Sequence, residues 1–373
     1  MRIGLLTSSR ADFGIYRPLI KEILGNKKFE LKIIAFGTHL SVFHGHTIDE
    51  IRNEGFEIKY TIDTILVSDS SESISTSIGL TIIKFSSFWK DYNDQFDIVL
   101  CLGDRYEMFA AVMSGISFGV KFAHIHGGEK TLGAIDNIFR HSITHASFIH
   151  FASTEEYRNR IIQILDDPNR VYYSGALSLD NLNSINLLNL DQFKLKWGID
   201  LIQPSILFTF HPETINSNLN LAYTDEIIEA ILSIENFPFI ITMPNADTCG
   251  NRVRKQFETR LEGRKNIFLV ENLGTQSYFT AMKYCQLLVG NTSSGIIEAA
   301  SFQKFVVNLG NRQAGRAMSQ NIINIEIKKN IIIDAINQTA LLGHYEGENI
   351  YLNKNQSASS IIIQALNNNE IYI

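Results

Sequence analysis

The amino-acid sequence predicts an α/β protein built from two doubly wound, Rossmann-like domains that face a central cleft. Three observations lead to this prediction. The chain has 373 residues, 45% of them apolar, which is more than one hydrophobic core usually supports. Short apolar runs such as Ile98–Leu102 alternate with amphipathic stretches, the pattern of parallel strands covered by helices on both faces. This regularity lapses once, between Ser178 and Pro204, where the two halves would be joined.

The elements of the first half alternate in the order that a parallel sheet requires. The periodicity predicts strands over 2–7, 30–36, 97–102, 121–125 and 149–152, and helices over 13–25, 47–54, 72–92, 105–115, 136–147 and 154–165. In the second half it predicts strands near 205–210, 238–242, 267–270, 286–289 and 304–308, and a last helix over 357–367. We therefore expect an N-terminal domain over 1–178, a second domain over 179–355, and a C-terminal helix, within 356–373, that packs back on the first domain.

Composition and charge exclude several classes of function. A net charge of −6 without a basic block argues against nucleic acid or an anionic membrane as a partner. We find no signal-peptide pattern and no apolar run long enough to span a bilayer, so we expect a cytoplasmic protein. The cysteines, Cys101, Cys249 and Cys285, are scattered and lack CxxC spacing, which indicates a reducing compartment and no zinc site.

The run Asn291–Gly295 is the most informative motif of the chain. It follows a short apolar strand and opens a helix, so that small residues aim free backbone N–H groups and a helix N-terminus at one point. Such a point suits a phosphate, and Glu298, four residues beyond Ser294, could accept hydrogen bonds from a neighbouring ribose. The alternative is an ordinary strand-to-helix turn.

Two polar clusters follow strands of the first half. Arg10, after the first strand, can bind a phosphate through its planar guanidinium, and we expect Asp12 to cap the following helix. Asp104 and Arg105 follow the buried strand at 97–102. For this pair the sequence leaves two readings open: the residues take part in chemistry, or they pair with each other.

A third cluster, His124–Glu129, ends the strand at 121–125. We expect the imidazoles of His124 and His126 to point to opposite faces and therefore not to share a metal ion. Further on, Asp136 and Arg140 lie at i, i+4 on one helix face. They form either a surface ion pair or part of a cleft, and their position just after a Gly-Gly turn favours the cleft.

The second half repeats this arrangement of polar residues after strands. His211 can act as an acid, a base or a phosphate donor, Asn245 can donate to a phosphate or a sugar, and Arg312 adds a further cation. Because ligands of doubly wound sheets bind at the carboxyl ends of the strands, these clusters are consistent with one ligand. The sequence has no GxGxxG, P-loop, GxSxG or HExxH motif, so we expect no cofactor and no metal.

Taken together, SRAD, GDR, HIHGGE with a downstream D-x-x-x-R-H, FHPET, MPNAD, NTSSG-x-x-E and GNRQAGR resemble the hydrolysing UDP-N-acetylglucosamine 2-epimerases of bacterial sialic-acid-type sugar pathways. The resemblance runs from residue 7 to about residue 316 in the expected order. It implies a glycosyltransferase-B type fold, a UDP-sugar substrate, no cofactor, and a homodimer or homotetramer.

The resemblance also implies roles for individual residues. Ser293 and Ser294 would bind the diphosphate and Glu298 the ribose, with a group of further UDP-binding residues comprising Arg10, Arg105, His211, Asn245 and Arg312. The catalytic residues around the sugar would be Asp104, His126, Glu129, Asp136, Arg140 and His211. Many relatives carry a glutamate where this chain has His126, so either His126 or Glu129 would be the base.

The implied reaction eliminates UDP from UDP-GlcNAc to a 2-acetamidoglucal, which water then converts to N-acetylmannosamine (ManNAc) for sialic-acid-type sugars. A close alternative takes UDP-N,N′-diacetylbacillosamine toward legionaminic acid. Two other classes are a glycosyltransferase of the same fold and a UDP-sugar-binding regulatory module without catalysis. The sequence shows no basic amphipathic stretch that would suit a membrane-facing transferase.

Overall fold

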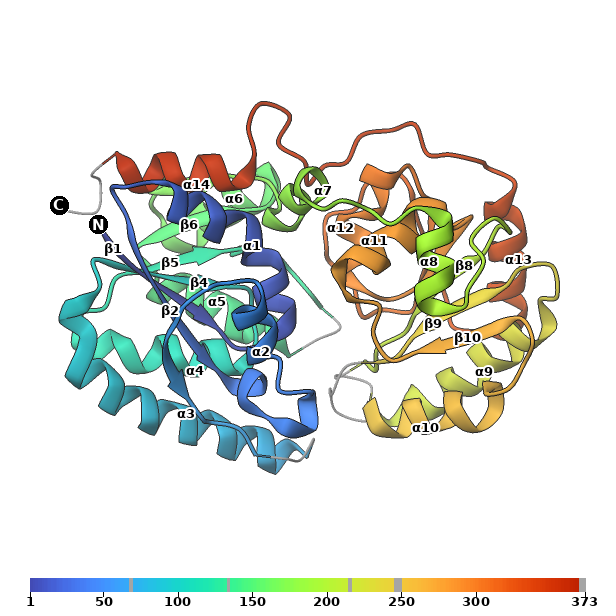
Figure 1. The fold of residues 1–373 in the computed structure, drawn as a ribbon, viewed down its shortest axis with the longest axis horizontal. Helices are drawn as coiled ribbons and strands as arrows, with labels where there is room; N and C mark the ends of the chain where they lie inside the picture. Colours follow the sequence, from blue (N-terminus) through green and yellow to red (C-terminus); the bar gives the residue numbers. More distant parts are fainter. Residues whose placement is uncertain (67–69, 133–134, 214–216, 245–249, 369–373) are drawn as a thin grey trace. The chain divides into compact units, whose positions relative to one another are not determined.

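The computed structural model describes residues 1–66, 70–132, 135–213, 217–244 and 250–368. The chain forms two compact units, each drawn in Figure 1. Unit 1 comprises Met1–Lys130, Asp136–Ser184 and the chain from Tyr351 onward, and unit 2 comprises Thr131–Ile135 and Ile185–Ile350.

Unit 1 is built on a seven-stranded parallel sheet with the order β3-β2-β1-β4-β5-β6-β7. Its strands are β1 (Arg2–Thr7), β2 (Glu30–Phe36), β3 (Ile58–Ile62), β4 (Ile98–Leu102), β5 (Phe122–Ile125), β6 (Ile149–Ala152) and β7 (Val171–Tyr173). Successive residues of a strand face opposite sides, so Leu5 joins one hydrophobic core and Leu6 the other. Both faces of the sheet are therefore buried, as the continuous apolar runs predict.

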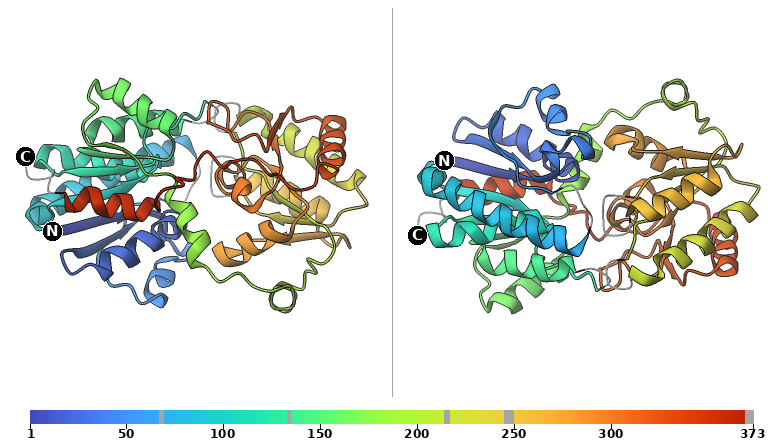
Figure 2. Two further views of the ribbon diagram at one scale, coloured as in Figure 1. Left: turned by 90° about the horizontal axis from the view of Figure 1, so that it is seen from above. Right: turned by 90° about the horizontal axis from the view of Figure 1, so that it is seen from below.

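Helices cover both faces of this sheet. They are α1 (Arg10–Gly25), α2 (Ile48–Asn53), α3 (Ser71–Tyr92), α4 (Tyr106–Gly115), α5 (Asp136–Ala146), α6 (Glu155–Leu165), α7 (Asp180–Ser184) and α14 (Ala358–Asn367). The C-terminal helix α14 packs against α1, and Figure 2 shows the two in unit 1 although they lie at opposite ends of the sequence. The Asp180 carboxylate holds the start of α14 by accepting hydrogen bonds from the Ala358 and Ser359 amides, at 3.1 and 2.7 Å.

Unit 2 repeats the plan with a six-stranded parallel sheet of order β10-β9-β8-β11-β12-β13. Its strands are β8 (Ile206–Thr209), β9 (Phe239–Thr242), β10 (Ile267–Val270), β11 (Leu287–Gly290), β12 (Val306–Leu309) and β13 (Ile322–Ile325). Its helices are α8 (Leu190–Trp197), α9 (Asn220–Ser233), α10 (Gly250–Leu261), α11 (Gly274–Tyr284), α12 (Ser293–Ile297) and α13 (Lys329–Ala340).

The predicted strands all occur, and the differences lie at the sheet edges and in the joining segment. The sequence pattern missed β3, β7 and β13, which are edge strands whose half-exposed residues give no continuous apolar run. The predicted irregularity between Ser178 and Pro204 is partly wrong, because α7 and α8 form there. Helix α8 begins with a capping box of Asn189 and Gln192.

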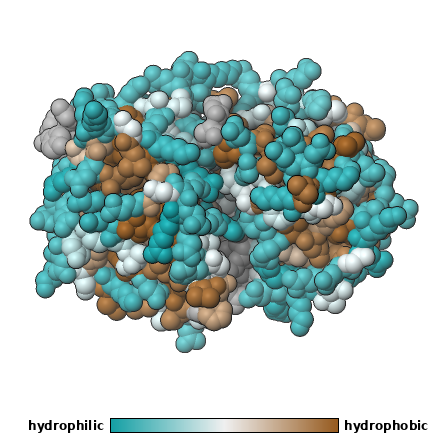
Figure 3. Space-filling model, in the orientation of Figure 1, coloured by the Kyte–Doolittle hydropathy of each residue, from teal (hydrophilic) through white to brown (hydrophobic). Residues whose placement is uncertain are grey.

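The surface agrees with the low net charge and the absence of long apolar runs. The face shown in Figure 3 is mainly hydrophilic, with hydrophobic side chains in small, scattered areas. Within the part of the chain that the structure describes, no helix combines the length and the hydropathy needed to cross a bilayer.

Candidate functional site

In each unit the polar clusters converge at the point where the strand order reverses. This switch point lies between β1 and β4 in unit 1, and between β8 and β11 in unit 2. Loops diverge at such a point and leave room for a ligand beyond the carboxyl ends of the strands. The loops concerned are 8–9 and 103–105 in unit 1, and 210–213 and 291–292 in unit 2. Arg10 is the first residue of α1, and Ser293 is the first residue of α12.

The loop after β1 is stabilised by its own side chains. Ser9 caps α1, with the Asp12 amide donating to its Oγ at 3.3 Å. Asp12 itself accepts hydrogen bonds from the Ser8 amide at 3.0 Å and the Ser8 hydroxyl at 2.6 Å. The prediction that Asp12 is the N-cap is therefore wrong. Its carboxylate lies in the first turn of α1 and binds the preceding loop at Ser8. Arg10 is exposed, and its Nη1 lies 3.7 Å from Glu50 Oε1.

The Arg105 guanidinium forms an ion pair with a buried carboxylate. Its Nη2 donates to Glu107 Oε1 at 2.7 Å, and the Glu107 side chain is 1% exposed whereas that of Arg105 is 32% exposed. Burial opposes the charge on Arg105, but the Glu107 and Asp12 carboxylates outweigh it and raise the pKa of the guanidinium well above its usual value. The predicted alternative of an Asp104–Arg105 pair is therefore wrong, since each residue has another partner.

Asp104 forms an ion pair with Arg140, a residue 36 positions further along the chain. The Arg140 side chain is 2% exposed and also donates from Nη1 to the Glu129 carbonyl at 3.1 Å, whereas the Asp104 side chain is 24% exposed. Arg140 thus lies inside unit 1, and the alternative of a surface ion pair is wrong. Asp136, the first residue of α5, is half-buried.

His126 and Glu129 lie together directly after β5. The strand ends at Ile125, and His126 has a φ of +65°. The Leu177 amide donates to its Nε2 at 3.2 Å, and because an N–H can only donate, the neutral ring carries its proton on Nδ1. That Nδ1 lies 3.4 Å from Glu129 Oε1, which also accepts a hydrogen bond of 2.8 Å from the Ser153 hydroxyl.

His124 has partners different from those of His126. Its Nε2 contacts the Gly103 carbonyl oxygen at 2.8 Å, and its Nδ1 contacts Thr144 Oγ1 at 3.1 Å. Strand alternation alone would place residues i and i+2 on the same face, so it does not explain the different partners of the two rings. The two rings separate because His126 lies beyond the strand, in a left-handed backbone conformation.

Buried histidines of unit 1 predict a loss of stability in mild acid. Burial lowers the pKa of His39 to about 4, of His124 to about 3 and of His150 to about 4. The unfolded chain binds protons at these residues already near pH 6.5, so their contribution is complete above that pH and is lost as the pH falls toward 4. Shifts of this size correspond to about 3–5 kcal/mol of unfolding free energy each.

Urea unfolding at pH values from 7.5 to 4.5 measures this effect. We expect the midpoint to fall steadily below pH 6.5, and the His39→Gln variant to show a shallower fall than the wild type. An identical slope in the two proteins would mean that His39 is not neutral in the folded state.

The NTSSG turn of unit 2 forms as predicted, although the helix that follows is short. Thr292 caps α12, with the Ser294 amide donating to its Oγ1 at 3.3 Å. Helix α12 has five residues, so its dipole is weaker than the predicted longer helix would have. The Ser294 amide is engaged within the turn and its hydroxyl is buried, whereas Ser293 is partly exposed. Glu298 lies at the C-terminal end of α12 and is 6% exposed.

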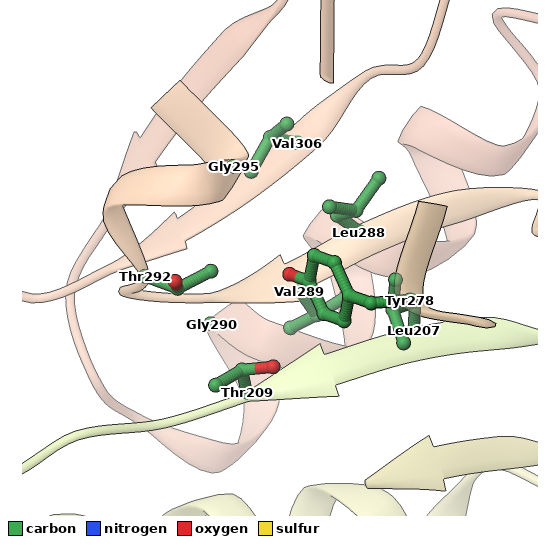
Figure 4. A pocket seen from close by; sticks show the side chains of 9 residues that line it. All are labelled: Leu207, Thr209, Tyr278, Leu288, Val289, Gly290, Thr292, Gly295 and Val306. Carbon is green, nitrogen blue, oxygen red and sulfur yellow. The ribbon is translucent and has the colours of Figure 1, made fainter. Parts of the chain in front are cut away.

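A small pocket lies beneath this turn, and Figure 4 shows Thr209, Tyr278 and Thr292 around it. Burial raises the pKa of the Tyr278 phenol to about 12, and the Glu298 carboxylate adds to the shift, so the phenol stays protonated as a hydrogen-bond donor. Gly290, with a φ of +138°, approaches the Thr209 carbonyl so closely that no side chain fits there.

Partly buried hydrogen bonds connect the loop after β12 to the turn and to the loop after β8. Arg312 donates from Nη1 to the Asn291 carbonyl oxygen at 3.4 Å, and the Asn311 amide donates to Glu213 Oε1 at 2.7 Å. His211 is 7% exposed. Asn245, predicted to bind UDP, lies outside the described residues.

Sequence reasoning assigned no role to three buried polar residues that contact the candidate sites of the two units, namely Glu107, Glu213 and Asn291. Each stands within two residues of a predicted site residue, and each is at most 1% exposed. A polar residue directly after an apolar strand was the available signal for Asn291. No group of three or more His, Cys, Asp or Glu side chains that could hold a metal ion occurs among the residues described.

Comparison with known proteins agrees with this geometry. Residues 21–367 match the family model described as UDP-N-acetylglucosamine 2-epimerase. The chain is 34% identical over 337 residues to the polysialic acid biosynthesis protein P7 of Escherichia coli, covering 90% of this chain and 85% of that protein. It is also 34% identical over 329 residues to the hydrolysing GDP/UDP-N,N′-diacetylbacillosamine 2-epimerase of Campylobacter jejuni, covering 87% and 84% of the two chains.

Among solved structures, the UDP-GlcNAc 2-epimerase of Neisseria meningitidis bound to UDP-GlcNAc superposes with a TM-score of 0.80. The identity is 18%, and the match covers 98% of this chain and 99% of the other, so this likeness shows the fold alone. The two Rossmann-like units are thus of the glycosyltransferase-B type, as predicted. With the family model matching nearly the whole chain and relatives above 30% identity, the protein belongs to the UDP-N-acetylglucosamine 2-epimerase family.

Proposed function

We propose that the protein is a hydrolysing UDP-GlcNAc 2-epimerase that releases ManNAc and UDP. The observation that carries this proposal is the Asp104–Arg140 ion pair, in which a partly exposed carboxylate is held by a buried arginine at the switch point of unit 1. A protein that only binds an anion has no use for a carboxylate in this place. The names of the hydrolysing relatives support the same reaction class.

The proposed division of labour follows the residue types of each unit. Unit 2 would hold UDP, with the Ser293 and Ser294 turn on the diphosphate, Glu298 on the ribose, and His211 and Arg312 as further donors. The arginines Arg10 and Arg105 of unit 1 would stabilise the departing diphosphate, since charge develops on that group in the transition state. Asn245 remains a predicted UDP contact.

In the first step the C1–O bond to UDP breaks and the C2 proton is removed. That proton has no adjacent carbonyl and becomes acidic only as positive charge builds at C1. Its bonding electrons form the C1=C2 double bond of the glycal, while UDP leaves with the electron pair of the C1–O bond. We assign one proton transfer to Asp104 and the other to the His126–Glu129 pair, with Asp136 near the sugar.

Within the pair, Glu129 is the better proton carrier. The Nε2 atom of His126 accepts from Leu177, which leaves the Nδ1 proton directed at the Glu129 carboxylate. In the second step water adds its oxygen to C1, and C2 takes a proton from the face opposite to the first abstraction. The product is free ManNAc, with inverted configuration at C2.

Two of the named relatives favour a second substrate. The relatives from Campylobacter jejuni and Legionella pneumophila, 34% and 30% identical, are named as hydrolysing enzymes for N,N′-diacetylbacillosamine linked to a nucleotide. That sugar differs at C4 and C6, away from the bonds that react. UDP-N,N′-diacetylbacillosamine is therefore our alternative substrate, and the proposed product would then serve legionaminic acid synthesis.

Incubation with UDP-GlcNAc in heavy water, followed by NMR, tests the proposed function. We expect free ManNAc with deuterium at C2 and one UDP per sugar. UDP-ManNAc as the retained product would indicate a non-hydrolysing epimerase and overturn the hydrolysis. Turnover of UDP-N,N′-diacetylbacillosamine alone would select the alternative substrate, and no turnover of either would favour a transferase of the same fold.

The proposed reaction also bears on location and assembly. Nucleotide sugars are made in the cytoplasm, so we propose that the enzyme acts there, without nucleic-acid or membrane partners. We further propose a homodimer or homotetramer, which light scattering on the purified protein measures directly.

A further inference from the structure

Asn291 is a fully buried residue whose polar groups all contact neighbouring loops of unit 2. It follows β11 directly and precedes the phosphate turn Thr292–Ser294. Its backbone amide donates to the Thr209 carbonyl at 3.0 Å, at the end of β8. An asparagine is rarely buried completely, and burial without partners would cost free energy. The hydrogen-bond partners of its side chain therefore indicate what this residue does in the unit.

The side-chain amide of Asn291 holds the backbone of His211 at two points. The His211 amide donates to Oδ1 at 2.7 Å, and Nδ2 donates to the His211 carbonyl at 2.8 Å. The residues are 80 positions apart. Two opposed hydrogen bonds between planar groups fix both the distance and the orientation of the His211 peptide. A carboxylate or an aliphatic side chain of similar size could not make both bonds.

The backbone carbonyl of Asn291 accepts hydrogen bonds from the loop after β12. Gln313 donates to it from Nε2 at 2.8 Å and Arg312 from Nη1 at 3.4 Å. Gln313 is 1% exposed, so this contact lies in the interior of the unit. One residue thus joins the loops after β8, β11 and β12, which carry the phosphate turn and two of the predicted UDP donors.

We propose that Asn291 is a positioning residue that sets His211 and Arg312 against the Thr292–Ser294 turn before UDP binds. The inference rests on the proposed function, because it takes the ligand of these loops to be a nucleoside diphosphate. Preassembled donors bind an anion more tightly, since the cost of ordering them is not taken from the binding energy. Asn291 itself would not touch the ligand.

Three variants separate positioning from general stability. Asn291→Ala removes both bonds to His211. Asn291→Asp keeps the size but replaces the donor by an oxygen that faces the His211 carbonyl, so that only its protonated carboxyl can restore both bonds. The matched control is Asn321→Ala: this asparagine is also 0% exposed in unit 2, but it binds the Lys304 carbonyl at the amino end of the sheet, at 2.8 Å.

Titration calorimetry with UDP as the ligand, melting temperatures, and kcat and KM provide the readouts. We expect Asn291→Ala to weaken UDP binding by about tenfold or more, whereas Asn321→Ala lowers the melting temperature and leaves UDP affinity near the wild-type value. For Asn291→Asp, whose ionised carboxylate cannot donate to the His211 carbonyl, we expect a loss of UDP affinity at pH 8 similar to that of Asn291→Ala.

The outcomes distinguish this inference from the proposed function. If Asn291→Ala binds UDP as tightly as the wild type, or if both alanine variants lose affinity in proportion to their melting temperatures, Asn291 has a structural role only and the inference is wrong. If Asn291→Asp binds UDP at pH 8 as tightly as the wild type, the two-point contact is not what matters and the inference is again wrong. A wild type that does not bind UDP would instead refute the proposed function, and this inference with it.

Discussion

The Asp104→Asn variant is expected to lose at least about a thousandfold in kcat while its affinity for UDP stays within a few fold. The asparagine has nearly the same shape and can still accept a hydrogen bond from Arg140, but it cannot take up a proton. The effect should appear in kcat because the proposed proton transfer occurs only after the UDP-sugar is bound. Kinetics with UDP-GlcNAc, together with calorimetry using UDP, measure the two quantities.

The chain offers a matched control at the other end of the same strand. Asp97 precedes β4 and pairs with Arg2 at 2.6 Å, whereas Asp104 follows β4 and pairs with Arg140. Asp97→Asn also breaks an aspartate–arginine pair in unit 1, but we expect it to retain activity. Arg140 is far more buried than Arg2, so the melting temperature of Asp104→Asn must be measured and the assay run below it. Loss of UDP binding in a folded Asp104→Asn protein would assign Asp104 a structural role.

The second large effect is expected from Glu298→Ala, which should weaken UDP binding by about ten- to a hundredfold. The proposed partner of this carboxylate is a ribose hydroxyl, and a hydrogen bond to a charged group is worth about 1.5–3 kcal/mol. Since ribose contacts are the same before and during the reaction, kcat at saturating substrate should change much less than KM.

A ligand lacking the ribose hydroxyls identifies the partner of Glu298. Wild type and Glu298→Ala are each titrated with UDP and with its 2′,3′-dideoxy analogue, which forms a double-mutant cycle. We expect the wild type to lose affinity for the analogue and the variant to lose none further. An equal loss in both proteins would mean that Glu298 does not bind the ribose. Its role would then be to stabilise the Thr292–Ser294 turn next to Tyr278.

Much of the fold was predictable because central parallel strands are apolar on both faces. Strands β1, β4 and β8 were predicted within one residue of their observed ends, since each is a continuous buried run. The edge strands β3 and β13 were not predicted, because none of their residues is fully buried and their composition resembles that of a loop.

Among the described residues, the polar clusters lie after strands as the sequence predicts, but several of their side chains have partners other than the predicted ones. Asp104 and Arg105 were expected either to take part in chemistry or to pair with each other, and the ion-pair partner of Asp104 is instead Arg140 on α5. Asp12 was expected to cap α1, yet Ser9 does so. Short sequence separation suggests pairs, but strand and helix directions decide which side chains meet.

The sequence by itself determined the two parallel sheets, the position of each polar cluster after a strand, and the motifs that identify the family. These features are local, because they depend on the hydrophobic periodicity and the residue types of short stretches of the chain. Only the tertiary structure decided which polar groups meet. Asp104 and Arg140 are 36 residues apart, His126 and Leu177 are 51 apart, and Asn291 and His211 are 80 apart. Such contacts depend on how strands are ordered in the sheet, and that order brings the loops after β8, β11 and β12 together at Asn291.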